Sequence, residues 1–323
     1  MKTIKRDQAT ATEYGAHLEP QLRVGPGESF LVETNDNLFN QAREKGLAAV
    51  AEPPLQALQI VRGNPLAGPV FVEGVEPGDT VVVEIESIEI RDWGWTGLLP
   101  GAGVLDGRIG WEDCSGPFST IIRHEPGPSG TLADGEGVMS LDREVRWPLA
   151  PFIGTIATAP ERGAENSVVT AGPWGGNIDV RHIAPGNRIH LNSAAAGGLL
   201  FLGDVHGSQA DSELTGVANE TAADVTLRCE SIAAKPVPGV CRIETPDSLI
   251  QVGAAREAGS PEAALNSCFV NMISWLVEDH GMSRREAYLH MTVNSAVRCH
   301  VYQFCMGLFT CGVEFPKQCL PER

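Results

Sequence analysis

Alternating hydrophobic and polar positions occur through much of the chain and predict β-strands. In the segment 80–90, Val81, Val83 and Ile85 fall on one side of an extended chain, and glutamates fall on the other. This alternation is typical of a half-exposed strand. Further strands are expected at 30–34, 68–74, 187–191, 198–202, 223–230, 242–245 and 248–252.

Helical periodicity occurs only near the C-terminus. Ser260 followed by Pro261 indicates a helix start, because serine caps free N–H groups and proline fits the first turn. Apolar residues then recur with helical spacing to about residue 280. A second helix is expected after Ser283, which can form a capping box with Glu286. We therefore predict a mainly β fold with a smaller α+β part, with a β-sandwich or barrel-like core and C-terminal helices.

The composition agrees with many turns and short strands. Glycine (36 residues) and proline (22 residues) are abundant, and both interrupt regular elements. A chain of 323 residues can bury a large core as one large domain or two smaller ones. We expect a mainly β N-terminal part over residues 1–160 and an α+β C-terminal part over residues 161–323, with a single intertwined domain as the alternative.

The acidity of the chain restricts its partners. Its formal net charge is -17, which argues against nucleic acids and anionic membranes, because both need basic surfaces. A small neutral or cationic substrate, or a bound metal, fits better. No signal peptide and no apolar run of the ~20 residues that a membrane span needs are visible. The eight cysteines match no zinc-binding spacing, so we expect a cytoplasmic protein with reduced, mostly structural thiols.

The segment 203–213 holds four titratable side chains close together, namely Asp204, His206, Asp211 and Glu213. It follows the apolar run 198–202, which predicts a buried strand that ends where the charges begin. Unpaired buried charge is costly, so this cluster suggests a cation or a water nucleophile held at the end of a rigid strand. The alternative is a solvated turn, since Asp and Gly favour turns for local reasons.

A second polar segment lies upstream, after the glycine pair 175–176. Glycine lets the backbone approach its neighbours closely or adopt positive φ. Asn177 and Asp179 are two residues apart, so in an extended chain both side chains point to the same side. We therefore expect the segments 177–182 and 204–213 to converge into one site.

The polar segments also share motifs with a known family. The motifs are Glu33-Thr-x-Asp36; Gly68-Pro-Val-Phe-Val-Glu-Gly-Val-Glu-Pro-Gly-Asp79; Gly175-Gly-Asn-Ile-Asp179; Gly203-Asp-Val-His206; Gln209-Ala-Asp-Ser-Glu213; and Ser283-Arg-Arg-Glu-Ala-Tyr288. In this order they resemble the acetamidase/formamidase family over most of the chain. One departure is that Ala210 and Ser212 stand where the family usually has glycines, which adds side chains and restricts φ.

The resemblance implies a mostly β homo-oligomer that hydrolyses a short amide to a carboxylic acid and ammonia. It implies a metal-associated site, with zinc or calcium open, whose ligands come from Asn177, Asp179, Asp204, His206 and Glu213. It also points to Glu33, Glu73 and Trp174 as substrate-binding candidates. The departures at positions 210 and 212 leave a larger amide or a lactam open as the substrate.

We expect amide hydrolysis to use Glu213 as the general base, with His206 and Asp211 as further catalytic candidates. A cation held by Asp179, Asp204 and His206 would polarise the carbonyl and acidify water. A serine or cysteine amidase is a rival mechanism, but no Gly-x-Ser-x-Gly elbow is present. A non-catalytic calcium- or sugar-binding β-sandwich is the rival from another class.

Overall fold

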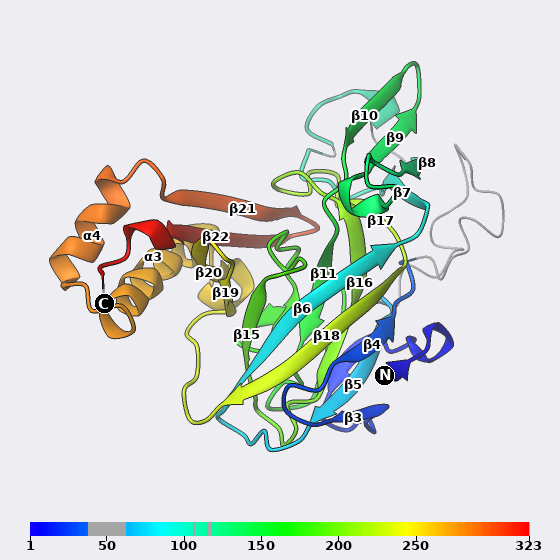
Figure 1. Ribbon diagram of the computed structural model, residues 1–323. Coiled ribbons are helices and arrows are strands. Elements are labelled where there is room, and N and C mark those ends of the chain that lie inside the picture. Colours follow the sequence, from blue (N-terminus) through cyan, green and yellow to red (C-terminus); the bar gives the residue numbers. More distant parts are fainter. Residues whose placement is uncertain (38–62, 106, 115–117, 323) are drawn as a thin grey trace.

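Two large β-sheets dominate the computed structural model, which describes residues 1–37, 63–105, 107–114 and 118–322 (Figure 1). Within these residues the first sheet has nine strands and its order is β1-β4-β18-β6-β15-β19-β20-β22-β21. In that order its strands are Lys2–Ile4, Phe30–Glu33, Ala223–Ile232, Thr80–Ile90, Arg188–Asn192, Cys241–Glu244, Ser248–Ala254, Leu308–Pro316 and Arg298–Cys305.

The second sheet has eleven strands among the described residues, with nine of them in the order β10-β9-β8-β7-β17-β16-β11-β14-β13. In that order they are Glu144–Pro148, Glu136–Ser140, Phe118–Glu125, Trp93–Leu98, Asn219–Glu220, Leu200–Ser208, Phe152–Ala157, Gly175–Asn177 and Ala171–Gly172. Strand β5 (Leu66–Val72) pairs with β16 and with β3 (Leu22–Val24). A separate pair joins β2 (Glu13–Gly15) to β12 (Ala164–Asn166).

Side chains from the two sheets meet in one hydrophobic core. Val81 and Ile85 of β6 belong to the same buried cluster as Ile153 of β11 and Leu202 of β16. The predicted alternation in β6 is confirmed, since Ile85 is buried and Glu86 is exposed. The expected mainly β fold is therefore present, built from open sheets that pack face to face.

Both sheets combine strands from either side of residue 160. Strand β18 lies between β4 and β6, and β16 pairs with β5. The domain boundary near residue 160 stays a prediction. Strands from both sides of this boundary pair with each other, as expected for the alternative of a single intertwined domain.

The expected C-terminal helices are present as α3 (Pro261–Glu278) and α4 (Arg284–Val293), after a short α2 (Ala255–Ala258). The Ser260 hydroxyl accepts the Ala263 N–H, and Ser283 and Glu286 form the capping box. Four 3₁₀ helices are also described: η1 (Arg6–Gln8), η4 (Glu112–Cys114), η5 (Leu132–Asp134) and η6 (Lys317–Cys319). No helix of the described residues is long and apolar enough to cross a membrane.

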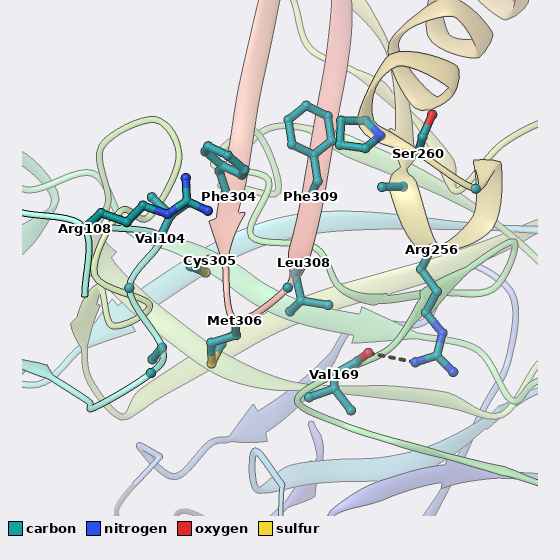
Figure 2. Close-up of a pocket in the computed structure, with 17 residues that line it drawn as sticks. Val104, Arg108, Val169, Arg256, Ser260, Phe304, Cys305, Met306, Leu308 and Phe309 are labelled. Atoms are coloured by element: carbon teal, nitrogen blue, oxygen red, sulfur yellow. Dashed lines mark hydrogen bonds between the residues drawn. The ribbon is translucent and has the colours of Figure 1, made fainter. Parts of the chain in front are cut away.

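The C-terminal helices and the strands β19 to β22 form an arm that extends from the main body (Figure 1). The β21–β22 hairpin reaches back from this arm towards the body, where its turn borders a cavity (Figure 2). Within the body, β11 pairs with β14 on one side and with β16 on the other. This pairing places the two polar segments of the sequence on strands that flank β11.

Candidate active site

Strand β16 carries Asp204 and His206 into the protein interior. Asp204 has a positive φ of +56°, so the regular alternation of a strand does not hold there. The two side chains nevertheless meet, with Nε2 of His206 3.3 Å from Oδ1 of Asp204, and the residues are 3% and 1% exposed. The expectation that this strand ends at Leu202 was wrong, because β16 continues to Ser208. The strand can carry charged side chains inward because each of them finds polar partners there.

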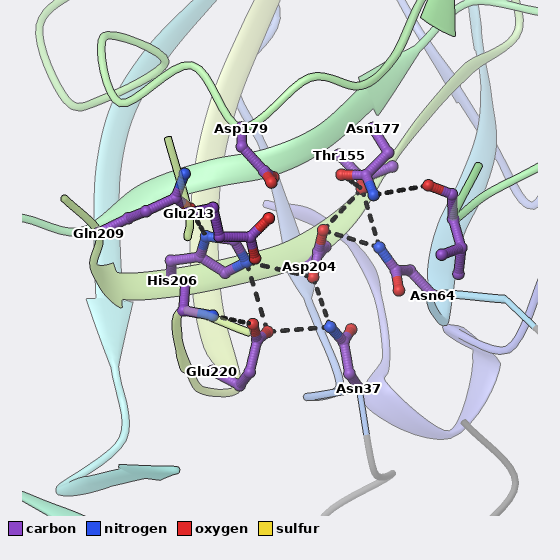
Figure 3. A network of polar contacts seen from close by, with 12 residues as sticks. Asn37, Asn64, Thr155, Asn177, Asp179, Asp204, His206, Gln209, Glu213 and Glu220 are labelled. Atoms are coloured by element: carbon purple, nitrogen blue, oxygen red, sulfur yellow. Dashed lines mark hydrogen bonds and ion pairs between the residues drawn. The ribbon is translucent and has the colours of Figure 1, made fainter. Parts of the chain in front are cut away.

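Three neutral donors hold the Asp204 carboxylate (Figure 3). Asn37 donates to Oδ1 at 2.7 Å, Asn64 donates to Oδ2 at 2.7 Å, and the Thr155 hydroxyl donates to Oδ2 at 2.8 Å. Burial pushes the pKa of Asp204 upward, but the charge of His206 and the hydrogen bonds hold that pKa below its ordinary value. Asp204 is therefore ionised at neutral pH.

The His206 ring lies between polar partners on both sides. Its Nδ1 is 2.8 Å from Oε1 of Gln209, and its Nε2 is 3.3 Å from Oδ1 of Asp204 and 3.3 Å from Oε2 of Glu220. Burial lowers the pKa of His206, but the two carboxylates outweigh burial and raise it well above its ordinary value. Three acceptors around two ring nitrogens agree with a doubly protonated ring.

Glu220 completes this side of the cluster and was not predicted from the sequence. Its Oε2 accepts from Asn37 at 2.9 Å, and its Oε1 accepts from the Ala218 N–H at 3.0 Å. Burial raises the pKa of Glu220 to about 7, against the opposing charge of His206. Glu220 lies in the two-residue strand β17, which is too short to show an alternating pattern.

Asp179 enters the cluster from the segment that follows β14. Its φ of +48° is in the left-handed region, which costs energy for a residue other than glycine and is common at functional sites. Gln303 of β21 donates to Oδ2 at 2.8 Å. The other oxygen, Oδ1, is buried and has no hydrogen-bond donor among the described residues.

Glu213 reaches the cluster from the loop after β16, also with a positive φ of +44°. The preceding Ser212 has a φ of +76°, which explains why a glycine suits this position in the family pattern. The Cys305 thiol donates to Oε2 of Glu213 at 3.1 Å. Burial raises the pKa of Glu213, and burial together with the charge of Glu213 raises that of Asp179.

The pair formed by Asp179 and Glu213 defines the chemical character of the site. Two neighbouring buried carboxylates cannot both stay ionised cheaply, so such a pair holds a proton or a cation. Within this cluster, two groups of side chains could hold a metal ion, namely Asp179, Asp204 and His206, and His206, Glu213 and Glu220. Within each group the ligand atoms lie within 4.8 Å of one another. The unpaired Oδ1 of Asp179 and this donor set fit a bound cation.

The other expected site residues lie elsewhere or play supporting parts. Asn177 borders the cluster, where its side-chain oxygen accepts from the Thr155 hydroxyl at 3.3 Å. The remaining four have side chains without a hydrogen bond to the cluster among the described residues. Asp211 pairs with Arg181, Glu33 pairs with Lys5, Glu73 is exposed, and Trp174 packs against a separate hydrophobic cluster.

Several residues of the site were not predicted from the sequence. They are Asn37, Asn64, Thr155, Gln209, Glu220, Gln303 and Cys305. Most are neutral donors in segments far from the acidic stretch. A usable signal was present for Gln209, which lies within the family motif three residues after His206.

Several known proteins and one family model are similar to this chain. A model of the "Acetamidase/Formamidase family" matches residues 2–172 and 149–305. An acetamidase structure from Bacillus halodurans is 27% identical, with a TM-score of 0.83 over 98% of this chain and 97% of that one.

Two further relatives are known by sequence. A formamidase from Methylophilus methylotrophus is 29% identical over 59% of this chain and 56% of its own. A putative formamidase from Schizosaccharomyces pombe is 24% identical over 64% of this chain and 60% of its own. The chain thus spans less than two thirds of the length of these formamidases. The match of the family model covers most of the chain, and we conclude that the chain belongs to the acetamidase/formamidase family.

Proposed function

We propose that this protein hydrolyses the C–N bond of short-chain amides to a carboxylic acid and ammonia. The observation that supports this most strongly is the buried cluster in which Asp179, Asp204, His206 and Glu213 meet from three separate segments. Amide hydrolysis needs a nucleophile, polarisation of the carbonyl and a proton for the leaving amine. The formamidase and acetamidase names of the relatives point to the same reaction.

Glu213 is the general base in this proposal. Burial raises the pKa of Glu213, which makes its carboxylate a better proton acceptor than an exposed glutamate. It takes a proton from the water that attacks the amide carbon. As the C–N bond breaks, it passes this proton to the leaving nitrogen, and ammonia departs. The Cys305 thiol, 3.1 Å from Oε2, fixes the orientation of this carboxylate.

We propose that Asp179, Asp204 and His206 hold a divalent metal, for which the His206 ring would give up its Nε2 proton, because only a neutral imidazole can bind a metal. A set that mixes carboxylates with an imidazole suits zinc better than calcium, because calcium prefers oxygen ligands alone. When bound, zinc supplies Lewis-acid polarisation and lowers the pKa of water. The hydrogen bonds from Asn37, Asn64 and Thr155 to Asp204 orient this ligand, as outer partners do in metal sites. Asn177, expected as a ligand, contributes by accepting from Thr155.

A cysteine nucleophile is a weaker candidate. Cys305 is the cysteine in contact with the cluster, and burial and the neighbouring Glu213 raise the pKa of its thiol. A thiol activated for attack needs the opposite shift, because the thiolate is the nucleophile. Chelation separates the mechanisms: we expect a strong chelator to abolish ammonia release and added zinc to restore it, whereas a cysteine enzyme would keep its activity.

One experiment tests the proposal as a whole. Purified protein is analysed for metal content and assayed for ammonia release from formamide, acetamide and propionamide. We expect about one zinc per chain and turnover of at least one of these amides. His206→Ala should lose the metal, and His190→Ala, a buried histidine that pairs with Glu244, should keep it. Bound metal without turnover of any amide would favour the non-catalytic binding protein.

We also propose that the protein is a cytoplasmic homo-oligomer. Large apolar side chains are exposed on the two long C-terminal helices, including Val270, Tyr288, Leu289 and Val293. Exposed apolar side chains of this kind are common where copies of a chain associate. Light scattering after size-exclusion chromatography should give a mass that is a multiple of 34.4 kDa. A monomer mass would contradict the oligomer.

A further inference from the structure

A cavity of about 820 Å³ lies beside the segment that holds Glu213. The β21–β22 hairpin, the 101–104 loop and the start of α3 surround it (Figure 2). Much of its lining is apolar and comes from Val104, Val169, Phe304, Met306, Leu308 and Phe309. Such a volume and lining are typical of sites for organic ligands.

One wall of the cavity contacts the proposed general base directly. Cys305 belongs to the lining, and its thiol donates to Glu213 at 3.1 Å. The backbone N–H of Phe304, its neighbour in the lining, donates to the Ser212 carbonyl at 2.7 Å. Two consecutive residues of the hairpin therefore fix the 212–213 segment from the side of the cavity.

A second wall is connected to the cluster by another route. Val169 lines the cavity, and the carbonyl of the preceding Val168 accepts from Asn177 at 2.7 Å. The carbonyl of Val169 itself accepts from Arg256 at 2.9 Å, and Arg256 also pairs with Glu165. The Arg256 cation is thus already compensated. Arg108 also lines the cavity, as an exposed cation, so the apolar side chains share the lining with one further positive charge.

We infer that this cavity binds the acyl group of the substrate, and that the preferred substrates are primary amides with a medium-length apolar acyl chain, such as hexanamide. This inference rests on the proposed amidase function. Formamide and acetamide have too few heavy atoms to fill a space of about 820 Å³. Burying additional methylene groups against Phe304, Met306 and Leu308 favours the longer substrate.

The test compares kcat/KM for hexanamide and acetamide in three proteins. We expect the wild type to prefer hexanamide, by roughly fourfold or more for each added methylene. Leu308→Trp fills the cavity and should lower the hexanamide-to-acetamide ratio by at least about tenfold. Leu141→Trp makes the same change at an exposed leucine (55% exposed) in a surface turn, and both rates should stay at wild-type values.

A second variant guards against misfolding of Leu308→Trp. The Phe304 side chain is 43% exposed, so Phe304→Ala should fold normally by circular dichroism and also lose much of the hexanamide preference. The inference is overturned if the wild type hydrolyses acetamide but does not prefer hexanamide, or if neither variant changes the ratio. It is also overturned if adipamate, which carries a carboxylate at the chain end, is preferred over hexanamide.

Failure of the proposed function gives a different result. If the wild type releases ammonia from no amide, calorimetric titration with hexanamide decides about the cavity. Saturable binding that Leu308→Trp removes would support the apolar acyl site in a protein that is not an amidase. The absence of binding heat would overturn both proposals.

Discussion

A β-carbon placed on Gly154 would lie 2.7 Å from Oδ1 of Asp179. The same β-carbon would lie 3.0 Å from Oδ2 of Asp204, so this glycine provides the space in which two carboxylates from different segments meet. Gly154 is in the middle of β11, the strand between β14 and β16. The convergence of the site therefore depends on a position that has no side chain.

Gly154→Ala should disrupt the cluster through this one methyl group. Gly154 does not have a positive φ, so alanine fits the backbone and the effect is steric. We expect the free energy of unfolding to fall by about 1–3 kcal/mol, as for other overpacked sites, and turnover to fall with metal content. Urea unfolding and elemental analysis measure both. Gly25→Ala is the control, because its nearest neighbour atom lies at 3.8 Å; equal effects of the two changes would contradict the steric argument.

Glu213→Gln should lower kcat by at least about 100-fold, the usual range for loss of a general base. Glutamine has nearly the same shape and can still contact Cys305, so the fold should persist. The matched variant is Asp211→Asn in the same loop. The Asp211 side chain is 52% exposed and pairs with Arg181, so we expect a rate within about twofold of the wild type. Ammonia-release kinetics give kcat for both variants. A large loss of kcat in Asp211→Asn with little loss in Glu213→Gln would assign the role of general base to Asp211.

The sequence predicted those strands and helices that have a clear local signal, whereas β7, β8, β21 and β22 were not among the expected strands. The alternation in β6 and the caps of α3 and α4 depend on neighbouring residues alone. Part of the site was also predictable, since Asp204, His206 and Glu213 lie within ten residues of one another. A strand is expected to end at charged residues, but β16 continues because distant residues compensate those charges.

The missing residues of the site are those supplied by tertiary contacts. Asn37 and Asn64 precede and follow the segment 38–62, which lies outside the described residues, and Gln303 comes from the C-terminal arm. Their amides carry no charge and no periodic pattern, so nothing in their own segments distinguishes them from surface residues. Glu220 is acidic, but its role depends on Asn37 and His206, which lie 183 and 14 residues before it in the sequence.

Glu220→Gln should make stability less sensitive to pH. Burial raises the pKa of Glu220 to about 7 in the folded protein, while the unfolded value is about 4.3. Between these two values the folded state binds a proton that the unfolded state lacks, so stability falls as pH rises through this window. As the pH rises from 4 to 8, we expect the free energy of unfolding of the variant to increase relative to that of the wild type by on the order of 3 kcal/mol.

Urea unfolding at both pH values, with Glu230→Gln as the control, measures this difference. Glu230 is exposed and pairs with Arg188, so its loss should leave the pH dependence of the free energy of unfolding unchanged. Parallel curves for Glu220→Gln and the wild type would show that Glu220 does not titrate in this range.

Gln303→Leu tests whether the C-terminal arm positions the site. Gln303 is fully buried on β21, and its amide donates to Oδ2 of Asp179 while Thr310 donates to its carbonyl oxygen. Leucine has a similar volume but no donor, so Asp179 loses the one hydrogen bond that its side chain accepts from a described residue. The pKa of Asp179, already raised by burial and by Glu213, should rise further, because a hydrogen bond to the charged form is lost. The acidic limb of the pH–rate profile should therefore move to higher pH, with a fall in kcat/KM of roughly tenfold at pH 7.

Thr310→Val removes only the group that orients Gln303 and should give a smaller shift in the same direction. A purely structural role would instead lower the free energy of unfolding in both variants and leave the pH–rate profile in place.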